Sequence, residues 1–132
     1  MVLDTNVFLS GVVWGGKPAK IIEKWAKGEF ELLVSEDTFS ELLKKANQKI
    51  QDYNLDPKLF VEIYTNLRRF ANWVEPKKKV TVCRDFKDNM LLELSLAGEA
   101  DFLISGDKDL LVLKKFKKTK IISPADFLAN SA

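Results

Sequence analysis

Short apolar segments alternate with helical patterns along this chain, and this order constrains the fold more than any other feature. Segments 1–4, 30–34 and 102–105 are short and mostly apolar, as buried strands are. Between them, apolar residues recur at helical spacing, for example over 21–26 and 39–46. Strands that are apolar on both faces belong to parallel sheets covered by helices on both sides. The pattern therefore predicts a doubly wound α/β fold.

The remaining elements continue the alternation. The first half has a loop at Gly11, Gly15 and Gly16, a helix from Pro18 to Gly28 and a helix capped by Ser35. A further helix begins at Asp56, and its residues predicted to face inward are Leu59, Phe60, Ile63, Leu67 and Phe70. The second half has extended pieces at 73–74 and 80–83, a helix over 89–97, a strand over 119–122 and a short helix after Ser123. The chain has 132 residues and no repeat or linker, so residues 1–132 are predicted to form one domain.

Two residue types are scarce enough to exclude whole classes of chemistry. The chain has no histidine, which excludes Ser-His-Asp and Cys-His nucleophile systems, histidine-liganded zinc and a histidine general base. Its one cysteine, Cys83, can form no intrachain disulfide and follows an apolar stretch, which favours a small core residue. No apolar run approaches the roughly 18 residues that span a membrane. No signal-peptide pattern opens the chain, so a cytoplasmic location is expected.

Acidic residues stand where a parallel sheet would bring them together. Asp4 ends the first strand and Asp107 follows the strand at 102–105, while Glu41 and Asp88 belong to neighbouring helices. Catalytic and ligand groups collect beyond the carboxyl ends of parallel strands, so these acids should converge on one cleft. A cluster of carboxylates without a cationic partner calls for a hard divalent cation, Mg²⁺ or Mn²⁺.

Each acid also has a structural explanation of its own. An aspartate such as Asp4 commonly forms a turn or caps a helix. Glu41 can pair with Lys45 one helical turn on, which contributes about 0.3–0.5 kcal/mol. Asp88 can cap a helix that begins at Asn89, which contributes about 1 kcal/mol. Only the joint placement of the acids favours a common site.

Two further acids and two lysine runs leave alternatives open. Asp85 is expected in a loop, and Asp109 is expected to cap a short helix over 110–113. The net charge is +2, but lysines concentrate at 77–79 and over 114–120. Such runs either form solvated surfaces or attract a polyanion such as RNA.

Three segments together resemble the PIN domain family of metal-dependent ribonucleases. They are 2–11 (VLDTNVFLSG), 85–94 (DFKDNMLLEL) and 97–110 (AGEADFLISGDKDL), and the likeness covers essentially the whole chain. The most similar branch contains small prokaryotic toxins of toxin–antitoxin pairs. The resemblance implies a three-layer α/β/α fold with a parallel sheet of about five strands and an acidic cleft that binds Mg²⁺ or Mn²⁺.

The resemblance also implies roles for individual residues. Catalytic roles are predicted for Asp4, Glu41, Asp88 and Asp107, metal ligation for Asp4, Asp88, Asp107 and Asp109, and supporting roles for Thr5, Asn6 and Ser105. Candidate RNA contacts are Lys77, Lys78, Lys79, Arg84, Lys87, Lys108 and the 114–120 run. Asp85 is a weaker candidate than Asp88, because the family's acid directly precedes the apolar helix turn.

The function that follows is hydrolysis of phosphodiester bonds in single-stranded RNA, with RNA, a cognate antitoxin and a second copy of the chain as expected partners. Trp14 or Trp25 could form the dimer surface or belong to the core. One alternative is a non-catalytic PIN-like module that binds RNA or protein. A haloacid-dehalogenase-type aspartyl-phosphate enzyme is a weaker alternative, because such enzymes need a second acid where this chain has Asn6.

Overall fold

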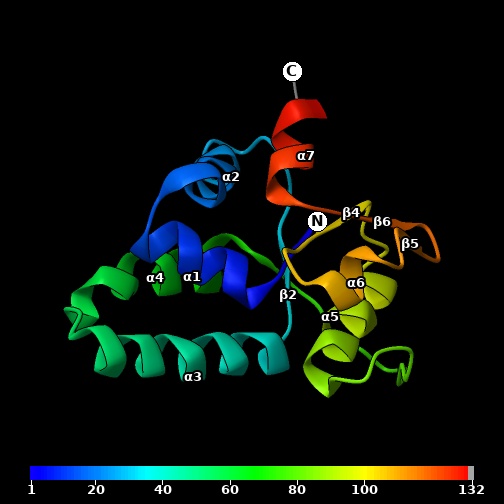
Figure 1. The fold of residues 1–132 in the computed structure, drawn as a ribbon, viewed down its shortest axis with the longest axis horizontal. Coiled ribbons are helices and arrows are strands. Elements are labelled where there is room, and N and C mark those ends of the chain that lie inside the picture. The colour runs from blue at the N-terminus through cyan, green and yellow to red at the C-terminus, as the bar shows by residue number, and fades with distance from the viewer. Residues whose placement is uncertain (131–132) are drawn as a thin grey trace.

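A computed structural model describes residues 1–130, in which helices and strands alternate (Figure 1). The elements are β1 (Val2–Leu3), α1 (Thr5–Val13), α2 (Gly16–Ala26), β2 (Leu33–Val34), α3 (Glu36–Tyr53), the 3₁₀ helix η1 (Pro57–Phe60), α4 (Val61–Phe70), β3 (Asn72–Trp73), α5 (Phe86–Ala97), β4 (Phe102–Ile104), α6 (Lys108–Leu111), β5 (Lys115–Phe116), β6 (Thr119–Ile122) and α7 (Pro124–Asn130). Within residues 1–130, no helix has the length and apolar character needed to cross a membrane.

The central sheet is mostly parallel. Strand β4 lies between β1 and β6 and runs parallel to both, and β5 adds an antiparallel edge next to β6. Strands β2 and β3 form a second parallel pair. The Leu33 N–H donates to the Met1 carbonyl at 2.8 Å, and the Met1 ammonium donates to the Glu31 carbonyl at 3.0 Å. These bonds place β2 alongside β1, so five parallel strands follow one another in the order β3, β2, β1, β4, β6.

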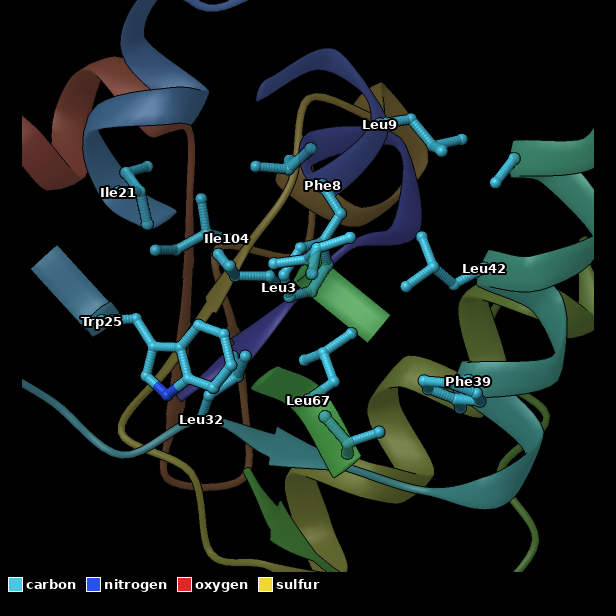
Figure 2. Packing of buried hydrophobic residues seen from close by; sticks show 14 of the residues in the cluster. Leu3, Phe8, Leu9, Ile21, Trp25, Leu32, Phe39, Leu42, Leu67 and Ile104 are labelled. Carbon is cyan, nitrogen blue, oxygen red and sulfur yellow. The ribbon is translucent and has the colours of Figure 1, made fainter. Parts of the chain in front are cut away.

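Alternate strand residues enter two separate cores, which is the reason for the continuously apolar strands. Leu3 and Ile104 belong to a cluster with residues of α1, α2, α3, α4 and α7. Figure 2 shows this cluster, of which Trp25 is a member. Leu103 faces the opposite cluster, which is built with α5 and α6. In Figure 1, α1 to α4 accordingly lie on one side of the strands and α5 and α6 on the other. The three-layer α/β/α prediction is confirmed.

Helix α1 occupies a segment where a loop was predicted around Gly11. Gly11 is buried in this helix, and a Cβ built there would lie 2.7 Å from Ile22 Cδ1 and 3.0 Å from the Ala19 nitrogen. The glycine therefore permits close packing of α1 on α2 and does not mark a turn. The turn between these helices is made by Gly15 and Gly16, whose φ angles are 80° and 67°.

The predicted helix after Asp56 is divided into η1 and α4, which changes its buried face. Phe60, Ile63 and Leu67 are buried as predicted, but Leu59 and Phe70 are exposed. The expectation was wrong for Leu59 because it lies in a 3₁₀ turn, whose three residues per turn give it a different direction from an α-helical residue. Phe70 shares the spacing of Ile63 and Leu67 but is the last residue of α4. Trp25 is a core residue, whereas Trp14 is 61% exposed and packs edge-on against Tyr53.

The segment 80–83, predicted to be extended, forms no strand and is held by side chains of α5. The Val80 N–H donates to Glu93 Oε2 at 3.0 Å. The Cys83 N–H donates to Asn89 Oδ1 at 2.8 Å, and Asn89 Nδ2 donates back to the Cys83 carbonyl at 2.9 Å. These bonds satisfy the backbone groups that a neighbouring strand would otherwise have to pair.

Candidate metal centre

Five acids, Asp85 among them, line one small cavity of about 70 Å³ at the carboxyl ends of β1 and β4. Asp4 follows β1, and Asp107 follows β4 across a short Ser-Gly turn. Glu41 comes from α3, and Asp88 from the first turn of α5. The structure thus brings together Asp4, Glu41, Asp88 and Asp107, the four acids selected from the sequence.

Asp4 is held rigidly by both of its carboxylate oxygens. It caps α1, where Oδ1 accepts from the Asn6 N–H at 3.2 Å, and Oδ2 accepts from the buried Ser105 hydroxyl at 2.7 Å. The same Ser105 Oγ accepts from the Asp107 N–H at 3.0 Å. Ser105 therefore joins the acid after β1 to the acid after β4, while Thr5 and Asn6 line the same cavity.

Asp88 is not the helix cap that the sequence suggested. Helix α5 begins at Phe86, and Asp85 is its N-cap, accepting from the Lys87 N–H at 2.9 Å. Asp88 lies in the first turn and is only 6% exposed. No hydrogen-bond donor within residues 1–130 reaches its buried Oδ2. A buried carboxylate oxygen without a partner is costly, so capping cannot account for this residue.

The surroundings of Asp88 disfavour its ionised form. Burial, and then the nearby carboxylates of Asp107, Asp4 and Asp85, raise the pKa of Asp88 from 3.8 to about 7. Like charges that converge in a poorly solvated space repel one another, and a cation bound among them removes that repulsion. The residues present therefore fit a divalent cation.

The closest carboxylates belong to Asp88, Asp107 and Asp109, each of which offers an oxygen within 4.8 Å of the others. Asp107, and not Asp109, caps α6 by accepting from the Asp109 N–H at 2.8 Å. Asp109 is in turn bound by Arg84 Nη2 at 3.0 and 3.1 Å. Three acidic oxygens at this spacing suit the oxygen-rich coordination of Mg²⁺ or Mn²⁺. Asp4 stands beside this triplet in the same cavity.

Glu41 shares the cavity with the other acids and lies close to two lysines, but its buried Oε1 accepts no hydrogen bond within residues 1–130. Its Oε1 lies 3.7 Å from Lys45 Nζ, as the helical spacing suggested, and 3.2 Å from Lys87 Nζ. Lys45 also donates to Asn6 Oδ1 at 3.4 Å. Lys45 was considered only as a surface partner of Glu41, although its i+4 spacing already placed it on the cavity side of α3.

The predicted RNA-contacting lysines divide into near and distant groups. Three basic residues lie near the acids. Arg84 pairs with Asp109, Lys87 pairs with Glu41, and Lys108 is the first residue of α6, directly after Asp107. Lys77 and Lys78 line a separate hollow beside Leu96 and Ala97, at the end of α5 away from Asp88, and Lys79 follows them in the same loop.

The 114–120 run forms the β5–β6 hairpin. Its turn precedes β6 at the amino ends of the strands, where Lys118 pairs with Glu99 at 3.2 Å. The expectation that this run borders the acidic cleft was wrong, because the direction of β6 carries the hairpin turn to the opposite end of the sheet.

Cys83 gives no support to a thiolate nucleophile. It is half-buried against the second core cluster. Burial and the carboxylates of Asp88 and Asp109 raise the pKa of its thiol. The side chain therefore stays protonated at neutral pH and packs as a small apolar group.

Comparisons with known proteins agree with this geometry. The sequence profile of the PIN domain matches residues 1–109, a span that contains Asp4, Glu41, Asp88, Asp107 and Asp109. The chain is also 27% identical over 138 aligned positions to an uncharacterized protein of Methanocaldococcus jannaschii, covering 97% of this chain and 88% of that protein. The match, the three-layer fold and the convergent acids lead to one conclusion. The chain belongs to the PIN domain family.

Proposed function

We propose that the protein is a metal-dependent ribonuclease that hydrolyses phosphodiester bonds of single-stranded RNA with Mg²⁺ or Mn²⁺. The observation that carries the proposal is Asp88, a buried carboxylate with an unpaired oxygen amid other acids. Without a ligand, a buried carboxylate among other acids destabilises the folded protein, and a bound cation would remove this destabilisation. The PIN domain fold makes a nuclease the natural activity for such a site.

The chain's own side chains have distinct parts in this proposal. A divalent cation, when bound, would polarise the phosphate and lower the pKa of water near it. Asp88, Asp107 and Asp109 would hold the cation, with Asp4, which accepts a hydrogen bond from Ser105, in the same cavity. No histidine base is required, in agreement with a composition that contains none.

Positive groups beside the acids are suited to a phosphate backbone. Lys45 and Lys87 line the cavity, while Arg84 pairs with Asp109 and Lys108 begins α6 directly after Asp107. Such charges orient a polyanion without recognising its sequence. We assign single-stranded RNA as the substrate on this basis and on the family resemblance.

The biological setting is the part of the proposal that rests on resemblance alone. The similar branch of the family consists of small toxins, so we propose that this chain is the toxin of a toxin–antitoxin pair and forms a homodimer. A cognate antitoxin would then cover the cleft and direct a basic side chain toward the acids.

The direct test is cleavage of end-labelled single-stranded RNA with Mn²⁺ and then Mg²⁺. Parallel reactions contain EDTA, the Asp4→Asn variant, and Asp126→Asn as a matched control at an exposed acid on α7. Cutting that is lost with EDTA and Asp4→Asn but kept in Asp126→Asn supports the proposal. A folded protein that binds RNA and cuts none with either metal would instead be a non-catalytic binding module.

A further inference from the structure

Phe86 places an exposed aromatic ring at the edge of the acidic cavity. It is the first residue of α5 and is 66% exposed. Its neighbours in the sequence, Asp85 and Lys87, both line the cavity, and so does Met90. Residues four apart lie on the same face of a helix, so Phe86 stands one turn outward from Met90. The ring is therefore at the rim of the cavity, on its solvent side.

Phe86 differs from the other exposed aromatic residues because its ring has no partner. The rings of Trp14 and Tyr53 pack edge-on against each other, and the guanidinium of Arg69 lies 5.6 Å from the centroid of the Phe70 ring. Within residues 1–130, no other ring and no cation contacts the ring of Phe86. A single exposed apolar side chain is common, but this one stands free beside a cavity of charged groups.

The cavity is too small to take in a nucleobase. Its volume is about 70 Å³, whereas pockets that enclose a small organic ligand have roughly 300–1,000 Å³. A phosphate group of an RNA strand can enter, but the base attached to the same nucleotide has to remain over the rim. Lys45 and Lys87 line the cavity, and Arg84, with a side chain that is 88% exposed, lies two residues before Phe86. These charges suit the phosphates, and Phe86 offers an apolar surface for the base.

We infer that Phe86 stacks on an unpaired base of the RNA, next to the phosphate held at the cavity. This inference rests on the proposed function and deepens it, because it names the feature by which single strands are selected. Bases in a duplex are already stacked and paired, so their faces are not open to the ring. Stacking on an aromatic side chain tolerates any sequence, since every base has a π face. The basic side chains around the ring favour a nucleic acid over an apolar protein surface as its partner.

The inference is tested by fluorescence anisotropy with a labelled single-stranded RNA and Mg²⁺, in the Asp4→Asn background so that the RNA stays intact. Phe86→Ala and Phe86→Leu should each weaken binding about 5–150-fold, the usual effect of removing one stacking ring, whereas Phe86→Trp should bind at least as tightly as the background. Leucine keeps apolar bulk without a ring, so it separates stacking from mere apolar contact. Phe70→Ala is the matched control, at an exposed ring directly before β3 and so at the opposite end of the sheet, and should bind like the background.

Two further measurements keep the test decisive if Phe86→Ala does not fold. RNA should quench the added tryptophan of Phe86→Trp, beyond any change in the background protein, because a stacked base quenches indole fluorescence. Once the cut site is mapped, an RNA that lacks one base beside it should be cut less efficiently by the wild type. A folded Phe86→Ala should cut this RNA and the complete RNA equally well, since the missing base and the missing ring belong to one contact.

The outcomes separate this inference from the ribonuclease proposal. Unchanged RNA binding by Phe86→Ala and Phe86→Leu, or RNA that leaves the fluorescence of Phe86→Trp no more quenched than that of the background, would overturn the inference; the ring would then be free for a protein partner, and the ribonuclease proposal would stand. Ring-dependent binding by a wild type that cuts no RNA would support the inference and overturn the ribonuclease proposal. A protein that binds no RNA would overturn both.

Discussion

Asp88→Asn should stabilise the metal-free protein at alkaline pH while destroying its metal site. The pKa of Asp88 is raised in the folded state from 3.8 to about 7 by burial and neighbouring carboxylates. The folded protein therefore holds this proton more tightly than the unfolded chain. By linkage, the contribution of Asp88 becomes less favourable as pH rises from about 4 to about 7, and stays unfavourable above that.

The size of the effect follows from the rise in pKa. A difference of about three pKa units corresponds to about 4 kcal/mol. Asp88 is buried, but Asp107 and Asp109 are only half-buried and their repulsion is partly screened, so we expect about half of this value, about 2 kcal/mol at pH 8. For a chain of this length, that gain is roughly a 6–10 °C rise in Tm. Asparagine keeps the shape of the side chain and removes the repulsion with Asp107 and Asp4.

The assay is thermal unfolding in EDTA at pH 8 and pH 4.5, followed by the same pair of scans with Mn²⁺ at pH 8. The variant should gain stability at pH 8 and show little difference at pH 4.5. With Mn²⁺ the order should reverse, because only the wild type gains binding energy. The control Asp126→Asn should show neither change. A variant less stable than the wild type at pH 8 in EDTA, or a gain that is equal at both pH values, would refute the electrostatic reasoning.

Three other predictions concern the packing of α1 on α2, the hydrogen bonds of Ser105 and the lysines at 114–120. Gly11→Ala should destabilise the fold by about 1–3 kcal/mol in urea unfolding, because the new methyl would lie 2.7 Å from Ile22 Cδ1; an unchanged midpoint would contradict this. Ser105→Ala removes the hydroxyl that donates to Asp4 at 2.7 Å and accepts from the N–H of Asp107, a proposed ligand, at 3.0 Å, so Mn²⁺ affinity measured by titration should fall about 10–100-fold; an unchanged affinity would contradict this. Lys118→Gln should leave RNA cleavage within about twofold of the wild type, since its ion pair lies at the opposite end of the sheet; a tenfold loss would show that RNA reaches that end.

The order of strands and helices and the convergence of Asp4 with Asp107 could be predicted from the sequence, because both depend on local or generic features. Continuously apolar strands require cover on both faces, and parallel strands deliver the residues after them to one edge. Ser35 was recognisable as a cap by residue type, and the structure adds its reciprocal bonds with Thr38. These features need no knowledge of distant contacts.

The errors came from residues whose local preferences are ambiguous. Asp85 and Asp88 both precede helix-forming residues, and Asp107 and Asp109 both precede the start of α6, so residue type alone could not identify the cap in either pair. Gly11 has the composition of a turn, yet it lies inside a helix because close contact with α2 requires the absence of a side chain.

The sequence by itself determined the fold class, the family and the set of acids that could form a site. Only the tertiary structure decided which of those acids are buried and which charged groups lie next to each of them. Burial and the nearby carboxylates raise the pKa of Asp88, and the packing of α5 beside α3 brings Lys87 Nζ to 3.2 Å from Glu41. The physical reason is that charge interactions depend on distance and solvation between residues far apart in the chain, and neither quantity is fixed until the sheet and its two helical layers have assembled.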